Sequence, residues 1–281
     1  MTLNQANLNE RLAVCSWSLQ PKNVEELIAG MLEIGLSRVQ LALEPLVGPS
    51  EGWRDTILRL REAGISIASG MMSCVGEDYT SIESIHRTGG VVPDVTWPET
   101  WANFRKVAPI AATNGIRLVT LHAGFIPDDE ESFLYAKLVK RIAQISALFS
   151  EYGVRTGLET GQERASTLLR FLQNVSEFDV GVNFDPANML LYGSGEPIDA
   201  LRSLLPFVKQ VHIKDATRSP QPGVWGEEVV VGTGEVDWRD FFKVLDSGKF
   251  SGYLAIEREA GNNRAGDIRT AKEYLDKLIG G

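Results

Sequence analysis

The sequence predicts a single α/β domain with the (β/α)8, or TIM barrel, fold, and two observations support this fold class. Apolar strand-like runs alternate with amphipathic helical stretches from one end of the chain to the other. Such alternation is typical of a parallel sheet with crossover helices. Eight strand-like runs occur in the 281 residues, and eight units of this size predict a sheet that closes into a barrel.

The predicted strands are short and rich in apolar, often β-branched, residues. In chain order they are LAVCSWSL (12–19), RVQLAL (38–43), ISIASGMM (65–72), IRLVTLHA (116–123), RTGLE (155–159), VGVNF (180–184), VKQVHIK (208–214) and YLAIE (253–257). We expect a helix after each strand, because apolar residues recur there at helical spacing and some stretches close with Gly. The helical stretches lie near 24–35, 53–64, 99–114, 131–152, 163–175, 237–248 and 265–279.

An open, doubly wound parallel sheet is the alternative fold. Such a sheet normally carries a glycine-rich phosphate turn after its first strand. Here the first strand runs into SWSLQPKN, which has no glycine, so the barrel is favoured. No change in composition marks a second domain, and we therefore assign residues 1–281 to one barrel.

Two connections are longer than the others and are predicted to form lids. Residues 73–98 follow the third strand, and residues 215–236 follow the seventh. Both leave the carboxyl ends of their strands, where barrel active sites are built. Loops of this length are usually functional or disordered, and Tyr79, Trp97 and Trp225 favour packed lids.

Composition excludes several classes of function. The net charge is −9, and no run of Lys or Arg provides the basic stripe of a nucleic-acid-binding protein. No apolar run reaches the length of about 18 residues that a membrane span requires. Cys15 and Cys74 are expected to be buried thiols. These thiols and an N-terminus without signal-peptide character predict a reducing, cytoplasmic location.

Four predicted strands end in a residue type that binds metals. These residues are Glu159, Asp185, His212 and Glu257, on the fifth to eighth strands. The ends of adjacent barrel strands converge, so we expect the four side chains to meet. A salt bridge to Arg or Lys could explain any one carboxylate, but it explains three carboxylates and a histidine on successive strands less well.

Three oxygen ligands and one nitrogen ligand favour a hard or borderline divalent cation. We therefore expect Mn2+, with Mg2+ or Co2+ as alternatives, while Zn2+ usually takes more nitrogen or sulfur ligands. Four protein ligands leave two positions of an octahedral metal open. A substrate with adjacent oxygens, such as a hydroxy-ketone, fits those positions.

Several further residues are candidates for contacts with a substrate. His122 ends the fourth strand and is either a hydrogen-bonded rim residue or a substrate contact, which its place on the active face favours. Lys214 should share the inward side of its strand with His212, where it binds a substrate oxygen or pairs with a ligand carboxylate. Trp17 and Glu44 end the first two strands, and rim packing or a helix-cap contact is the favoured interpretation of both.

The chain resembles the xylose-isomerase-like superfamily of sugar isomerases and epimerases. The resemblance covers most of the chain and depends on motifs that together, in this order, are quite specific. They are GLET (157–160), NFDPAN (183–188), QVHIKD (210–215), GTGEVDW (232–238) and AIERE (255–259). It implies a metal-dependent sugar enzyme that often forms dimers or tetramers.

The ketose 3-epimerase branch of this superfamily implies roles for individual residues. Its metal ligands match Glu159, Asp185, His212 and Glu257. Its proton-transfer pair matches Glu159 and Glu257, which implies proton abstraction next to a carbonyl through an enediolate, and its substrate-binding Arg matches Arg218. Carboxylates on two sides of a substrate can act as base and acid while a metal stabilises the oxyanion.

One position departs from the epimerase pattern. That branch usually has a histidine three residues after the Asp of the sixth strand, where this chain has Asn188. Asn188 can hydrogen-bond a hydroxyl group but carries no charge, so the identity of the substrate stays open. Related branches, among them inosose dehydratases and 3-dehydroshikimate dehydratases, eliminate water at a similar site. A lyase is therefore the second hypothesis, and a barrel that binds sugar without turnover is the third.

Overall fold

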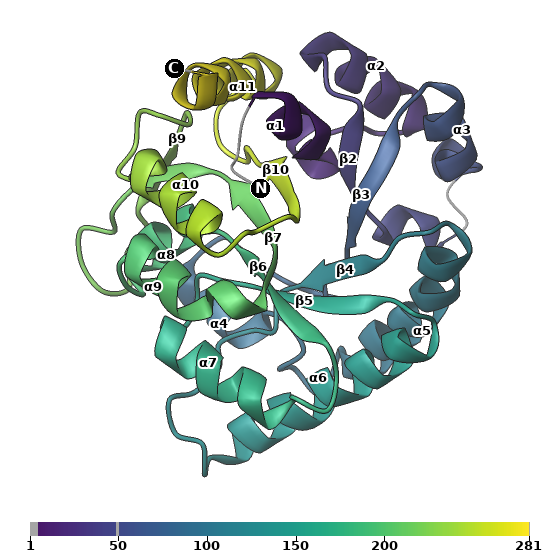
Figure 1. Ribbon diagram of the computed structural model, residues 1–281. Helices are drawn as coiled ribbons and strands as arrows, with labels where there is room; N and C mark the ends of the chain where they lie inside the picture. Colours follow the sequence, from purple (N-terminus) through teal and green to yellow (C-terminus); the bar gives the residue numbers. More distant parts are fainter. Residues whose placement is uncertain (1–4, 49–50, 281) are drawn as a thin grey trace.

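The computed structural model describes residues 5–48 and 51–280, and its centre is a closed barrel of eight parallel strands (Figure 1). The strands run in the order β1-β10-β7-β6-β5-β4-β3-β2, and β2 pairs with β1 to close the barrel. Their bounds are β1 Leu12–Cys15, β2 Arg38–Ala42, β3 Ser66–Met71, β4 Leu118–Leu121, β5 Arg155–Glu159, β6 Val180–Phe184, β7 Val208–Ile213 and β10 Tyr253–Ile256. The predicted fold class is confirmed.

Helices surround the barrel (Figure 1). They are α1 Gln5–Arg11, α2 Val24–Ile34, α3 Thr56–Glu62, α4 Ile82–Thr88, α5 Trp97–Thr113, α6 Phe133–Glu151, α7 Ala165–Asn174, α8 Pro186–Tyr192, α9 Pro197–Leu204, α10 Trp238–Ser247 and α11 Arg264–Gly280. Short 3-10 turns complete the list: η1 Ser16–Leu19, η2 Glu44–Leu46, η3 Glu51–Trp53 and η4 Leu205–Phe207. Among the described residues, no helix is long and apolar enough to cross a membrane.

The structure differs from the sequence prediction between β6 and β7, where no helical stretch was identified. Two helices, α8 and α9, fill this connection. Asp185 caps α8 by accepting hydrogen bonds from the backbone N–H groups of Ala187 and Asn188, and Pro186 occupies the first turn. Asp followed by Pro is a helix-start signal that the strand pattern of NFDPAN obscured.

The predicted first strand was too long at its carboxyl end. β1 stops at Cys15, and the residues that follow form η1. Gln20 closes this turn with a φ of 50°, a left-handed conformation that no strand contains. The turn brings Trp17 back over the barrel mouth rather than along the strand direction.

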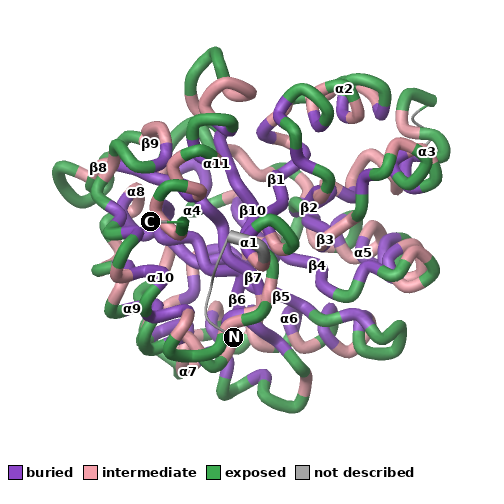
Figure 2. Tube along the Cα trace, turned by 45° about the horizontal axis from the view of Figure 1, so that its top comes forward, coloured by how far each residue is buried: buried purple, intermediate pink, exposed green. Residues whose placement is uncertain are grey.

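Buried residues are concentrated along the barrel strands (Figure 2) and form two clusters. The main apolar core lies between the strands and the helices. Inside the barrel, the apolar cluster contains small side chains, Ala13, Cys15 and Ala255. Fully buried polar side chains fill much of the remaining interior: Gln40, Ser69, Thr120, Asn183 and Gln210. The barrel interior therefore supplies hydrogen bonds beneath the mouth.

The 215–236 connection is tied to the barrel by the buried carboxylate of Asp215, which pairs with no metal-ligand candidate. Its oxygens accept hydrogen bonds from the backbone N–H groups of Ala216, Gly232, Gly234 and Val236 and from Nε1 of Trp238. A Cβ atom at Gly234 would lie 2.2 Å from Asp215 Oδ1, so this position requires glycine. The GTGEVDW motif is thus structural. Within the connection, β8 Asp215–Thr217 and β9 Glu227–Val229 form an antiparallel ribbon.

Candidate metal centre

The four predicted ligands meet at the carboxyl ends of β5, β6, β7 and β10. Nδ1 of His212 lies 3.4 Å from Glu159 Oε1, 3.7 Å from Asp185 Oδ2 and 3.3 Å from Glu257 Oε2. One ligand atom from each residue lies within 4.8 Å of all the others. All four residues are buried. Adjacent strands in the barrel order bring the four heads together, as their strand-end positions require.

Two buried atoms at the centre of this group have no hydrogen-bond partner, and both are suitable metal ligands. They are Oδ2 of Asp185 and Nδ1 of His212. The other oxygen of Asp185 caps α8. The other ring nitrogen of His212, Nε2, lies 2.8 Å from Gln40 Oε1, and donation to that oxygen leaves Nδ1 with a free lone pair. A lone pair surrounded by carboxylates fits a cation.

The remaining carboxylate oxygens are held by side-chain donors. Glu159 accepts hydrogen bonds from Asn183 Nδ2 at 3.1 Å and from Asn188 Nδ2 at 3.0 Å. Glu257 accepts one from Trp17 Nε1 at 2.7 Å and one from Lys214 Nζ at 2.9 Å. Each oxygen keeps further acceptor capacity for a metal or a substrate. Such partners orient metal ligands.

The ion pairs and the burial shift the pKa values of these groups in opposite directions. Burial raises the pKa of Asp185 to about 6. Burial also acts to raise the pKa of Glu257, but the Lys214 and His212 charges lower it by more, to well below its usual value. Burial lowers the pKa of His212, yet the anionic groups around it raise it by more. Without a metal ion the site therefore favours a proton on Nδ1 of His212, the atom whose lone pair a metal would take, while Glu257 stays ionised.

Lys214 takes the second of its predicted roles, pairing with carboxylates. Its Nζ lies 2.9 Å from Glu257 Oε2, 2.7 Å from Glu259 Oε2 and 3.3 Å from Asn188 Oδ1. An ammonium group has three N–H donors, and here each has an acceptor. Lys214 also lines the cavity above the site, so a substrate contact stays a prediction.

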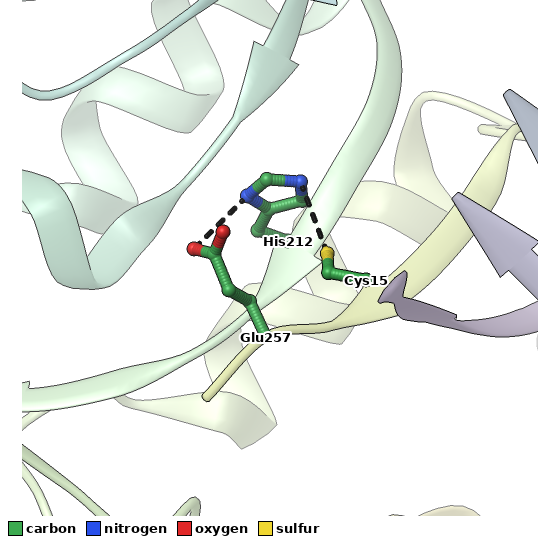
Figure 3. Close-up of side chains that lie close together, drawn as sticks. All are labelled: Cys15, His212 and Glu257. Carbon is green, nitrogen blue, oxygen red and sulfur yellow. Dashed lines mark hydrogen bonds and ion pairs between the residues drawn. The ribbon is translucent and has the colours of Figure 1, made fainter. Parts of the chain in front are cut away.

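Cys15 lies on the opposite side of the His212 ring from Glu257 (Figure 3). Its Sγ atom is 3.7 Å from His212 Nε2 and 3.5 Å from Gln40 Oε1. Burial raises the pKa of the Cys15 thiol to about 12, so it is neutral near pH 7. Cys15 packs beneath the imidazole ring, and both Cys15 and Cys74 are buried, as predicted.

A cavity of about 540 Å3 opens above the four ligands. Its wall includes Glu159 and Glu257, together with the predicted contacts His122, Asn188 and Lys214. Gly161, with a φ of +141°, allows Asn188 to pack directly against the backbone, because a Cβ atom at position 161 would lie 2.3 Å from Asn188 Cβ. A second cavity, of about 570 Å3 near α3, contains none of the four ligands.

Arg218 does not join this group. Its guanidinium forms two hydrogen bonds with Glu196, at 2.8 and 3.1 Å, and lies 3.6 Å from Glu235. Its side chain is 41% exposed and is not part of the cavity wall. The resemblance implied a contact between Arg218 and the substrate, and that contact stays a prediction; in this structure acidic side chains outside the cavity hold the guanidinium.

Sequence reasoning missed several residues that support the site. Trp17 was interpreted as rim packing, yet it donates to Glu257. Gln40 and Asn183 contact His212 and Glu159 from inside the barrel. The available signal was the presence of polar residues within apolar strand runs, RVQLAL and VGVNF. A polar side chain that points into a closed barrel needs a partner.

Comparison with known proteins agrees with this architecture. The family model described as "Xylose isomerase-like TIM barrel" matches residues 31–278. A crystal structure of a xylose isomerase domain protein from Planctomyces limnophilus is 32% identical, with a TM-score of 0.85 over 95% of this chain and 96% of that one. The structure of D-psicose 3-epimerase with D-tagatose from Clostridium cellulolyticum H10 shares the fold, with a TM-score of 0.71 at 13% identity over 96% and 100% of the two chains.

The curated relatives are similar over shorter stretches. An inosose dehydratase from Clostridium perfringens is 24% identical over 48% of this chain. The match spans 50% of that protein, so the chain covers about half of its length. The family model and the 32% identical structure decide the classification. The chain belongs to the xylose isomerase-like TIM barrel family.

Proposed function

We propose that this protein is a divalent-metal-dependent isomerase or epimerase of a sugar or polyol-derived hydroxy-ketone. One observation carries the proposal: two buried acceptor atoms without partners, Asp185 Oδ2 and His212 Nδ1, face each other between two further carboxylates. A buried cluster of this kind needs a cation to be stable. Membership of a family that includes isomerases and epimerases supports the same chemistry.

Glu159, Asp185, His212 and Glu257 would hold the metal. Mn2+ suits this donor set best, with Mg2+, Co2+ or Zn2+ as alternatives. When bound, the metal would polarise a substrate carbonyl and stabilise negative charge on its oxygen.

Glu159 and Glu257 are the proposed proton-transfer pair. They stand on β5 and β10, which β6 and β7 separate in the barrel, so they approach the cavity from different sides. One carboxylate removes the proton from the carbon beside the carbonyl, giving an enediolate. The other takes a proton from solvent and delivers it to the opposite face, and the first carboxylate then releases its own proton to solvent. Trp17 and Asn183 fix the orientation of the two carboxylates.

His122 and Asn188 would bind substrate oxygens. His122 Nε2 lies 3.7 Å from Glu159 Oε1, at the edge of the cavity. Asn188 holds Glu159 with its amide nitrogen and Lys214 with its amide oxygen. Its neutral side chain stands where the epimerase branch usually has histidine.

A dehydratase is the second candidate, and two observations favour it. The ammonium of Lys214 lies beside Glu257 on the cavity wall, where it could protonate a departing hydroxyl group. A curated relative is an inosose dehydratase. A keto-inositol would then lose water after the same first proton abstraction.

The test is incubation of Mn2+-loaded protein with keto sugars and inososes in D2O. Deuterium incorporation at carbon without loss of water supports an epimerase, and a product lighter by one water supports the dehydratase. Glu159→Gln should lower kcat by about 10²–10⁴-fold. Glu151→Gln, an exposed change on α6, should leave kcat unchanged. If no member of the panel exchanges or reacts, the proposed enzyme activity is wrong, and sugar binding that survives in Glu159→Gln would favour a non-catalytic barrel.

A further inference from the structure

The cavity above the metal centre has a strongly acidic wall. Five carboxylates line it, on Glu44, Glu159, Glu228, Glu257 and Glu259. The basic side chains on the same wall are Lys214 and His122. A divalent cation and one ammonium supply fewer positive charges than these carboxylates supply negative ones. A cleft lined by one sign of charge repels ligands of that sign.

The cations near this wall are already engaged. All three N–H groups of Lys214 have acceptors, two of which are carboxylates. Nη1 of Arg258 lies 2.9 Å from Glu228 Oε1, and Nε of Arg258 lies 2.9 Å from Asp267 Oδ2. Arg218 is held by Glu196 outside the cavity. None of the three offers a free fork for a phosphate or carboxylate group.

The helix that begins at the metal centre offers no anion site either. Free backbone N–H groups at a helix N-terminus commonly bind phosphate. At the start of α8, Oδ1 of Asp185 already accepts from the N–H groups of Ala187 and Asn188. A substrate anion would meet the Asp185 carboxylate there instead of free donors.

Glu44 stands on the half of the barrel mouth opposite the metal ligands. It begins η2, directly after β2, and accepts a hydrogen bond from the backbone N–H of Ser73. Among the described residues, it forms no ion pair with Lys, Arg or His. Burial raises the pKa of Glu44. Its remaining acceptor capacity suits a hydroxyl group, because a carboxylate accepts hydrogen bonds and donates none.

Aromatic rings complete the wall between the two halves. Trp17, Tyr79, Tyr192 and Trp225 all line the cavity. Rings of this kind provide apolar surface for the C–H face of a polyol, while a few polar groups set its orientation. The cavity thus combines a metal centre at one end, hydroxyl acceptors at the other and apolar surface between them.

From these features we infer that the substrate is a neutral polyhydroxylated ketone, without phosphate or carboxylate, and that Glu44 is a specificity-determining residue. Glu44 accepts a hydrogen bond from a hydroxyl group at the end of the substrate far from the metal. This inference rests on the proposed function, since it places the reacting carbonyl at the metal end.

The experiment compares matched neutral and anionic compounds on Mn2+-loaded protein. D-fructose is paired with D-fructose 6-phosphate, and a neutral inosose is paired with 3-dehydroshikimate. Deuterium exchange gives kcat/KM, and calorimetry gives Kd independently of turnover. We expect each anionic member to show kcat/KM and affinity at least about 100-fold below its neutral partner, because like charges brought together cost several kcal/mol.

Variants at residue 44 test the second half of the inference. Glu44→Gln should raise KM for the neutral substrate by about 3–10-fold and change kcat less than twofold, since one charged hydrogen bond weakens. Glu44→Lys should reduce the difference in kcat/KM and in Kd between D-fructose and D-fructose 6-phosphate. Glu62→Gln, an exposed change on α3, is the matched control and should leave both constants unchanged.

Failure of the inference and failure of the proposed function give different results. Equal or tighter binding of a phosphorylated or carboxylated compound overturns the inference, whichever reaction occurs. An unchanged KM in Glu44→Gln overturns the role of Glu44. Calorimetric binding of neutral sugars without exchange or water loss anywhere in the panel leaves the substrate class supported and contradicts the proposed enzyme activity.

Discussion

The two halves of the barrel mouth are built in different ways. On β5, β6, β7 and β10, the four proposed ligands leave the strand ends themselves and are almost fully buried, with Glu159 6% and His212 0% exposed. On the other half, Trp17, Glu44 and Tyr79 come from turns and loops, and Tyr79 is 45% exposed. The first half is thus positioned by strand register and the second by loop conformation.

This difference separates two kinds of chemistry. The strand-end half holds charged groups whose positions depend on one another, because each carboxylate oxygen of Glu159 and Glu257 has a hydrogen-bond partner. Apart from Trp17, which donates to Glu257, the loop half presents an acceptor and ring faces that can vary without disturbing the barrel. We therefore expect changes in the first half to affect metal binding and changes in the second to affect substrate affinity.

The largest effect is expected from His212→Ala. This change removes the proposed nitrogen ligand, Nδ1, which lies between the three carboxylates, and leaves only oxygen ligands for the metal. The affinity for Mn2+ should fall by more than about 100-fold, since even outer partners of metal ligands contribute 10–100-fold. Calorimetric titration of metal-free protein with Mn2+ measures this affinity. His86→Ala, which changes an exposed histidine on α4, should bind Mn2+ like the parent; equal binding by both variants would contradict the site.

The pH dependence of stability should reverse when metal binds. The pKa values of His212 and Asp185 are raised in the metal-free fold, that of Asp185 to about 6. Both groups hold protons more tightly than in the unfolded chain, so their contribution to stability is lost as pH rises through the raised values. The Tm of metal-free protein should therefore fall as pH rises from about 5 to 8.

Metal-loaded protein should show the opposite trend over the same range. The ligands must lose their protons to bind metal, so metal affinity and the stability that it adds rise with pH. Thermal unfolding with excess Mn2+ and after chelation gives the two curves. Parallel curves would show that His212 and Asp185 are not ligands.

The strand-end half could be predicted from sequence because its residues occupy regular positions. Glu159 ends β5 where it pairs with Asn183 of β6, and His212 pairs with Ala255 of β10, so counting along apolar runs was sufficient. The loop half could not be predicted in this way. Trp17 reaches Glu257 from the 3-10 turn η1, and a local turn of this kind leaves no periodic signal.

Arg218 shows a different limit of sequence reasoning. The family resemblance implied a substrate contact, which stays a prediction, and the structure gives its guanidinium two carboxylate partners outside the cavity. Glu196 lies before α9, in the region where no helix was predicted. A residue's partner in a long connection depends on the fold of other connections, which spacing does not encode.

Trp17→Phe tests the boundary between the two halves. Trp17 stands after β1, yet its Nε1–H donates to Glu257 Oε1 at 2.7 Å. Phenylalanine keeps much of the ring and removes this donor, so Mn2+ affinity should fall by about 10–100-fold. Calorimetry with Trp101→Phe on α5 as the control measures the effect. Unchanged affinity would mean that the bond does not orient Glu257.

The smallest effect is expected from Trp225→Ala, in the long connection that follows β7, which we predict to be a lid. Its ring packs against Tyr192, with ring centroids 4.6 Å apart, and Tyr192 also contacts Phe125. Loss of one aromatic pair, worth about 0.5–1.5 kcal/mol, should raise KM by about 2–12-fold while Mn2+ affinity stays unchanged. Tyr192 ends α8, whose first turn carries Asn188 and is capped by Asp185. If Trp225→Ala weakened metal binding as much as Trp17→Phe, α8 would transmit lid packing to the ligands, and the halves would form one coupled unit.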